Sequence, residues 1–179
     1  MSGPAEGHPR PRPPADVPLG FRWMYTRGYD LAVPAGVAFQ WMADHAPSRG
    51  PPTTTGGPRA SDGDTRLERR VYHRGRTEKF TRWELAPPDR VTFHDEVYQR
   101  GRLVVQGEER YRFLGGDGSG CIVEVTALRR PVGWLSRIGF ALFPERSVRS
   151  RSQEAELLLQ IEQDHRRGSI RVVPAAETR

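Results

Sequence analysis

The feature that most constrains the fold of this chain is a series of segments in which apolar and polar residues alternate. They cover 66–74, 76–86, 90–99, 102–114 and 121–130. A period of two residues is typical of half-buried strands. The breaks between them are turn-forming sequences, Arg74-Gly75, Pro87-Pro88-Asp89, Arg100-Gly101 and Gly115-Gly116-Asp117-Gly118. Connections this short predict an antiparallel meander rather than parallel strands joined by crossover helices.

One strand and one helix are predicted before this series. Residues 25–33 alternate as a strand and end at Pro34, and residues 37–45 follow with apolar positions at helical spacing. The flanking segments are different in composition. Residues 1–20 are rich in Pro and Arg, which predicts a disordered tail, and the Pro- and Gly-rich stretch 46–65 is expected to form a long loop inside the domain.

Two further helices are predicted after the strand series, which Pro131 closes. Residues 132–143 have apolar positions at helical spacing, and we interpret them as a connector helix packed on the core. A longer helix is expected over 146–166, with Gly168 as its stop. In this longer helix Glu154 is one of the polar residues expected to face water.

Length and composition indicate one domain, expected over residues 21–168, followed by a loose tail at 169–179. Both ends of the chain are polar, so the apolar residues that could form a core are concentrated between them. The sequence contains neither a run of about 18 apolar residues nor an apolar signal core. We therefore expect a cytoplasmic protein.

The charge of the chain predicts a mixed, solvated surface rather than a nucleic-acid interface. The net charge is +6, but acidic residues are interleaved with the basic ones through most of the expected domain. A local exception is the group Arg146, Arg149 and Arg151, which follows an apolar stretch. The single cysteine, Cys121, is expected in the core, and no ligand spacing for a metal is present, so we predict neither metal nor cofactor.

The order of these elements resembles the START, polyketide-cyclase and Bet v 1-like superfamily, and in particular its uncharacterised bacterial branches. The resemblance covers roughly residues 23–167. It is carried by the strings 29–37 (Tyr-Asp-Leu-Ala-Val-Pro-Ala-Gly-Val), 85–91 (Leu-Ala-Pro-Pro-Asp-Arg-Val) and 161–167 (Ile-Glu-Gln-Asp-His-Arg-Arg). It implies an α+β helix-grip fold, in which a curved antiparallel sheet of about six to seven strands surrounds a long C-terminal helix and encloses a ligand cavity.

Several polar residues interrupt the apolar faces of the predicted strands. Side chains at positions i and i+2 point to the same face of a strand, so these residues are candidates for polar anchors in an otherwise apolar cavity. Buried charges need partners, either each other or a ligand oxygen. His94 is expected at the surface. The candidate ligand-binding residues are Arg27, Tyr29, Arg69, Asp95, Glu109 and Tyr111.

Three functions are compatible with this pattern. The first is a carrier or sensor that binds a hydrophobic or amphipathic small molecule, such as a lipid, a polyketide or an isoprenoid-like compound. The second, implied by the resemblance, is a polyketide cyclase or dehydratase with Asp95 or Glu109 as general base. Arg27 or Arg69 would then stabilise an enolate oxygen. No catalytic residue is assigned on the sequence.

The third function is a partner-binding module without a ligand. It depends on residues 132–143, for which three alternatives to the core-packed connector remain open. This segment could gate the cavity, form a homodimer contact, or lie against a membrane surface as a peripheral contact with the following arginines on lipid headgroups.

Overall fold

The computed structural model describes residues 13–45, 65–72, 76–115, 118–142 and 151–168. Within them six strands form one antiparallel sheet in the order β1-β6-β5-β4-β3-β2. The strands are β1 (Arg22–Leu31), β2 (Thr65–Tyr72), β3 (Thr77–Ala86), β4 (Arg90–Gln99), β5 (Arg102–Gly115) and β6 (Cys121–Pro131). The predicted meander is therefore confirmed as β2 to β6, and the first strand joins it beside β6.

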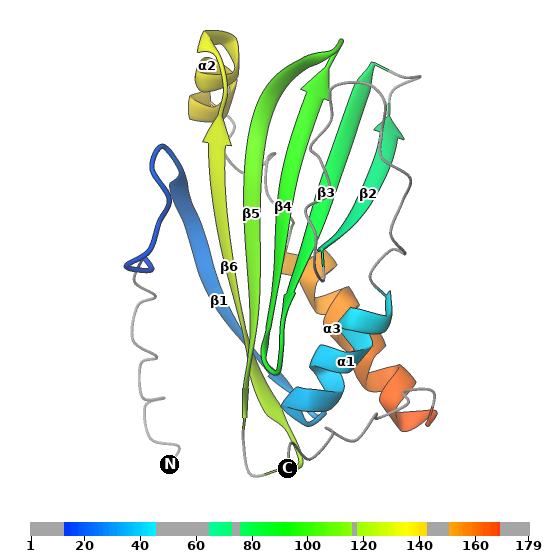
Figure 1. Cartoon of the computed structure of the whole chain (residues 1–179). Coiled ribbons are helices and arrows are strands. Elements are labelled where there is room, and N and C mark those ends of the chain that lie inside the picture. The colour runs from blue at the N-terminus through cyan, green and yellow to red at the C-terminus, as the bar shows by residue number, and fades with distance from the viewer. Residues whose placement is uncertain (1–12, 46–64, 73–75, 116–117, 143–150, 169–179) are drawn as a thin grey trace, which may run out of the picture.

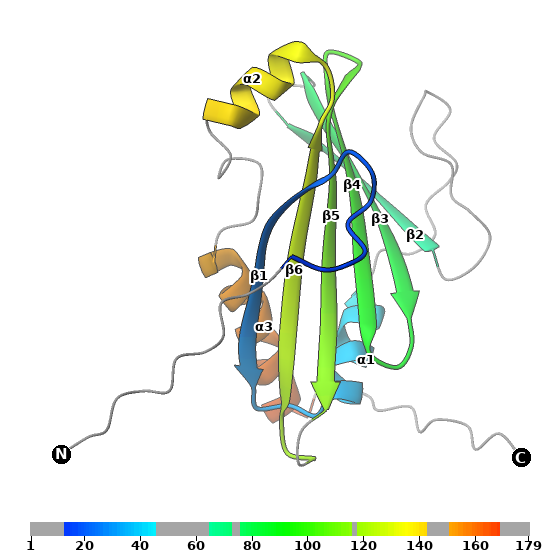
Figure 2. The same cartoon turned by 90° about the vertical axis from the view of Figure 1, so that its left-hand side faces the viewer.

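The described helices lie at two different ends of this sheet (Figure 1). They are α1 (Ala35–His45), α2 (Trp134–Leu142) and α3 (Arg151–Arg166). In both views α1 and α3 lie together against one face of the sheet, whereas α2 follows the end of β6 at the opposite end (Figures 1 and 2). We call the face toward α1 and α3 the inner face. A sheet packed around the C-terminal helix is the helix-grip arrangement that the sequence predicts.

The pairing register explains which residues reach the core. Residues directly opposite each other in neighbouring antiparallel strands point to the same face. Val91 pairs with Tyr111, and Tyr111 pairs with Val125, so these three side chains form one apolar row on the inner face. All three are fully buried and pack with apolar residues of both helices. The helix contributions to this core are Ala38, Phe39, Trp41 and Met42 from α1 and Leu158 and Ile161 from α3.

Two predicted breakers have the backbone conformation that a turn or a helix end requires. Arg100 and Gly101 join β4 to β5 and both have positive φ angles, 50° and 74°. Two consecutive positive φ angles match the right-handed twist of a tight hairpin. At the end of α3, Gly168 has a φ of 69° and its N–H donates to the carbonyl of His165, which confirms it as the stop.

The described part of the N-terminal segment, from residue 13, runs across the outer face of the sheet (Figure 2). It is attached there by Asp16, whose carboxylate accepts a hydrogen bond of 2.6 Å from Arg110 of β5. The hydrogen bond and the charge of Arg110 hold the pKa of Asp16 below its usual value. The described residues of this segment are thus joined to the domain by a charged contact, whereas residues 1–12 lie outside the described part of the chain, as do 46–64 and 169–179.

Gly107 leaves the space that the side chain of Arg129, opposite it on β6, occupies. A Cβ atom at this position would lie 2.7 Å from Nη1 and 3.2 Å from Cδ of Arg129. Arg129 is held by an ion pair with Glu109, so it cannot move away without losing that pair. We expect Gly107→Ala to lower the free energy of unfolding by about 1–3 kcal/mol, measured by urea denaturation.

Gly28 of β1 is the matched control for this substitution, because a Cβ atom there would meet nothing within 4 Å. Gly28→Ala should leave stability unchanged or raise it slightly, by reducing the entropy of the unfolded chain. Equal effects of the two substitutions would show that the approach of Arg129 does not constrain position 107.

Candidate functional site

Ionisable and hydroxyl side chains gather on the inner face, on β3 to β6 next to the apolar rows toward the end that carries α2, and on β1 and α3 beside the core. The register brings them into adjacent rows. Asp95 pairs across to Gly107 and Gly107 to Arg129, while the next row contains Phe93, Glu109 and Ala127. We refer to the following residues as the inner-face polar group: Tyr25, Arg27, Tyr29, Lys79, Thr81, Asp95, Glu109, Arg129 and Glu154.

The most buried ion pair of this group joins Glu109 of β5 to Arg129 of β6. The two side chains are only 4% and 5% exposed. Nη2 of Arg129 donates to Oε1 of Glu109, and Nη1 donates to the Leu128 carbonyl at 3.0 Å. A buried charge without a partner is costly, so each of these residues requires the other.

A second buried carboxylate, that of Asp95, has partners on the neighbouring strand β3. Thr81 donates its hydroxyl at 2.8 Å, and the ammonium of Lys79 lies 2.9 Å away. The side chain of Asp95 is 7% exposed, whereas that of Lys79 is 30% exposed. This pair therefore connects a buried anion to a cation that solvent or a ligand can reach.

The third acid of the group comes from α3 and joins that helix to β1. Glu154 is fully buried and accepts hydrogen bonds from the hydroxyls of Tyr25 and Tyr29, the latter at 2.5 Å. Its Oε2 atom also lies 3.1 Å from Nη1 of Arg27. Burial, together with the hydrogen bond and charge of Glu154, raises the pKa of Tyr29 to about 12 and that of Tyr25 further.

Four of the six predicted ligand-binding residues belong to the inner-face polar group: Arg27, Tyr29, Asp95 and Glu109. Tyr111 is fully buried in the core, with its ring 5.1 Å from that of Phe93. Arg69 of β2 lies opposite Phe80 of β3 in the backbone register. Phe80 is the neighbour of Thr81, a member of the polar group, so these two positions of β3 belong to opposite faces of the sheet. The backbone therefore does not place Arg69 in the rows of Asp95 and Glu109.

Five members of the group were not predicted as site residues: Tyr25, Lys79, Thr81, Arg129 and Glu154. The expectation that Glu154 faces water is wrong, because it shares a helix face with Leu158 and Ile161 and that face packs on the sheet. The spacing of 154, 158 and 161 was a visible signal for burial. For Arg129 the signal was the alternation of Cys121, Val123, Val125 and Ala127, which continues to position 129.

One buried donor on the inner face has no hydrogen-bond partner among the described residues. It is the indole Nε1–H of Trp83, which lies in the same row as Phe93 and Glu109. The indole ring packs edge to face on Phe93 at 4.3 Å. Buried N–H groups nearly always have an acceptor, so an orphan donor calls for an explanation such as a ligand or a water molecule.

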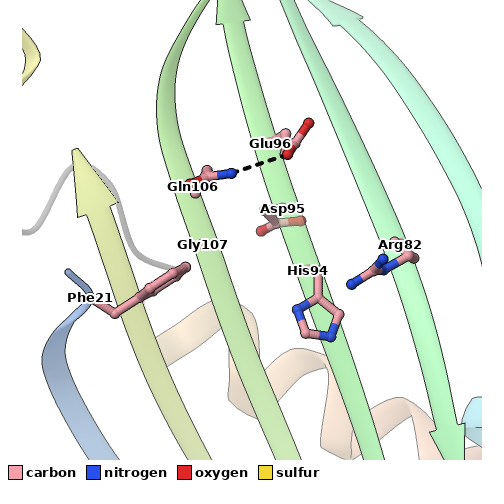
Figure 3. Close-up of a pocket in the computed structure, with 7 residues that line it drawn as sticks. All are labelled: Phe21, Arg82, His94, Asp95, Glu96, Gln106 and Gly107. Atoms are coloured by element: carbon pink, nitrogen blue, oxygen red, sulfur yellow. Dashed lines mark hydrogen bonds between the residues drawn. The ribbon is translucent and has the colours of Figure 1, made fainter. Parts of the chain in front are cut away.

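The outer face carries a hollow with a cavity volume of about 140 Å³, and Asp95 of the inner-face polar group is one of its lining residues (Figure 3). Phe21 bounds it on one side and polar residues of β3, β4 and β5 on the other. His94, which is on this face as expected for a surface residue, lies 3.0 Å from Glu84 and 3.6 Å from Glu108. The hollow is lined by Phe21, Arg82, His94, Asp95, Glu96, Gln106 and Gly107.

No protein-family model and no curated protein match this chain. Similar solved structures include norcoclaurine synthase from Thalictrum, which is 11% identical, with 84% of this chain and 99% of that chain covered and a TM-score of 0.49. An aromatase/cyclase from Streptomyces is 13% identical over 84% and 99% of the two chains, with a TM-score of 0.42. Human STARD10 is 9% identical over 86% and 77%, with a TM-score of 0.37.

These neighbours are of the START, polyketide-cyclase and Bet v 1-like kind that the sequence resembles. Their TM-scores lie below 0.5. Similarities this low do not establish a fold. The helix-grip fold is assigned to this chain from its own strand order and from the position of α3 against the sheet.

Proposed function

We propose that this protein binds an amphipathic small molecule against the inner face of its sheet, as a carrier or sensor. The observation that carries the proposal is the orphan indole N–H of Trp83, a buried donor beside the ionisable rows of the polar group. A ligand oxygen that accepts this hydrogen bond would satisfy it. The apolar part of the ligand would pack on the aromatic side chains around it.

The charges of the polar group favour a ligand that carries a hydrogen-bond acceptor. Stability alone does not require buried ion pairs, because apolar residues of similar volume often serve as well or better. Two partly exposed members carry more donors than their ion pairs use: the ammonium of Lys79 and the guanidinium of Arg27. Ammonium and guanidinium groups donate several hydrogen bonds and accept none. A carboxylate, carbonyl or hydroxyl group is the chemistry that matches them.

The cyclase alternative receives less support from the same geometry. It needs Asp95 or Glu109 as a base, but these carboxylates are already paired with Lys79 and Arg129. Turnover of a polyketide analogue that is lost in Glu109→Gln, with binding retained, would establish the enzyme instead.

Binding can be tested with dansylaminoundecanoic acid, a fluorescent amphipath with a carboxylate. We expect the protein to bind it, and Trp83→Phe to weaken binding roughly three- to tenfold by removing one donor. Lys79→Met should also weaken it. Native mass spectrometry of protein purified from a bacterial host should show a retained small molecule.

Two matched variants control for general damage. Trp23→Phe removes an indole whose N–H donates to Thr26 instead, at 3.1 Å, and Arg82→Met removes a cation of β3 from the outer-face hollow. Both should bind the probe as the wild type does. Absence of probe binding, or the same affinity in all four variants, would rule out this site.

A further inference from the structure

Helix α2 presents an apolar surface to solvent, contrary to the prediction that residues 132–143 pack on the core. Trp134, Leu135, Ile138 and Leu142 are 70%, 67%, 51% and 67% exposed. Of the nine residues of this helix only Phe140 is buried, below the guanidinium of Arg22 at 5.9 Å from its ring centre. The connector interpretation is wrong because the buried side of α2 is limited to this one aromatic anchor.

The four exposed residues share one face of the helix. At about 100° per residue, positions 134, 135, 138 and 142 fall within a sector of about 100°, and Phe140 lies on the other side. We call these four residues the α2 apolar face. Contiguous exposed apolar residues of this size mark an interaction surface rather than ordinary surface variation.

The charge around the α2 apolar face is positive. The helix itself contains Arg137 and no acidic residue. From residue 130 to 142 the chain contains two arginines, Arg130 and Arg137, and no acidic residue. The whole chain, in contrast, has 28 basic and 22 acidic residues. An apolar helix face with nearby arginines is complementary to an anionic lipid surface, which offers both an apolar interior and negative headgroups.

The position of α2 also suits a flat partner. The helix lies at the end of the sheet opposite to α1 and α3 in both views, so these two helices do not cover it (Figures 1 and 2). No helix among the described residues is long and apolar enough to cross a membrane. A nine-residue helix can instead lie in the interface with its apolar face toward the acyl chains.

We propose that the α2 apolar face docks the protein on anionic membranes as a peripheral contact. A symmetric dimer through the same face would bring Arg137, and Arg130 next to the helix, of the two copies together, which like-charge repulsion opposes. The contact does not depend on the ligand proposed for the inner face. An amphipathic ligand would nevertheless be available in such a membrane.

Cosedimentation with phosphatidylcholine vesicles, with and without phosphatidylglycerol, tests this proposal. We expect binding to the anionic vesicles, weaker binding to the neutral ones, and release as the salt concentration rises. Replacing Leu135 and Leu142 together by Asn should reduce the partition coefficient about tenfold or more. Both side chains are mainly exposed, so thermal unfolding should be unchanged.

The matched control is the double variant Ile122→Asn and Leu159→Asn, whose side chains are each 50% exposed elsewhere on the molecule. It should bind vesicles as the wild type does. Failure of the wild type to bind anionic vesicles, or an equal loss in both double variants, would overturn the proposal. Self-association that depends on Leu135 and Leu142, without vesicle binding, would assign the surface to a second copy and would overturn it as well.

Discussion

Arg129→Met is expected to lower the free energy of unfolding by about 3–5 kcal/mol, because it leaves the Glu109 carboxylate buried without its cation. Both side chains are almost entirely inaccessible to water, so solvent cannot replace the lost partner. The measurement is urea denaturation at neutral pH, in which the midpoint should fall while the slope stays constant.

The double variant Glu109→Met and Arg129→Met separates the charge from the packing. It removes both ions and should recover most of the lost stability, since an apolar pair of similar volume is often tolerated. Arg130→Met, at the exposed neighbouring position, should change stability by less than about 0.5 kcal/mol. A double variant as unstable as the sum of its single variants would contradict a paired role for these residues.

Glu154→Ala is expected to cost about 2–4 kcal/mol, the second largest effect. The carboxylate accepts from two phenols and one guanidinium and is the described polar contact that joins α3 to the middle of β1. The expected loss is smaller than for Arg129 because Arg27 is partly exposed and can recover water. Glu156→Ala, on the exposed side of the same helix, should be nearly neutral.

Glu154→Gln isolates the effect of the charge on the two tyrosines. Without the negative charge, the raised pKa values of Tyr25 and Tyr29 should move down toward 10, which ultraviolet titration of the phenolates detects. The pKa of Tyr98, raised to about 12 by burial and by Glu96, should not change. A Tyr29 titration identical in wild type and variant would remove Glu154 as a cause.

The same shifts predict how stability depends on alkaline pH. A folded-state pKa above the unfolded value of 10 means that folding favours the neutral phenols. Their contribution is fully present below pH 10 and is lost as the pH rises through about 12. We therefore expect the stability of the wild type to fall over this range, and that of Glu154→Gln to fall less steeply.

The strands were accessible to prediction because their signals are local. Alternation and turn residues act over a few positions, so the expected segments 90–99 and 102–114 agree with β4 and β5 to within one residue. The expected helix end near residue 166 is equally local, because it depends on Gly168. The expected start at 146 lies outside the described residues.

The partners of the polar residues were not accessible in the same way. The alternation of β4 and β5 placed Asp95 and Glu109 on the face with the apolar residues, where they are. It did not indicate that Asp95 pairs with Lys79 or that Glu109 pairs with Arg129, because these contacts depend on the register between strands.

The sequence by itself determined the series of strands, their antiparallel order along the chain and the place of Arg27, Asp95 and Glu109 on the apolar faces. Only the tertiary structure decided that Glu154 is buried and that the apolar residues of α2 are exposed. The physical reason is that periodicity defines the faces of a helix but not what covers them. That depends on where the helix lies relative to the sheet, which contacts distant in the sequence establish.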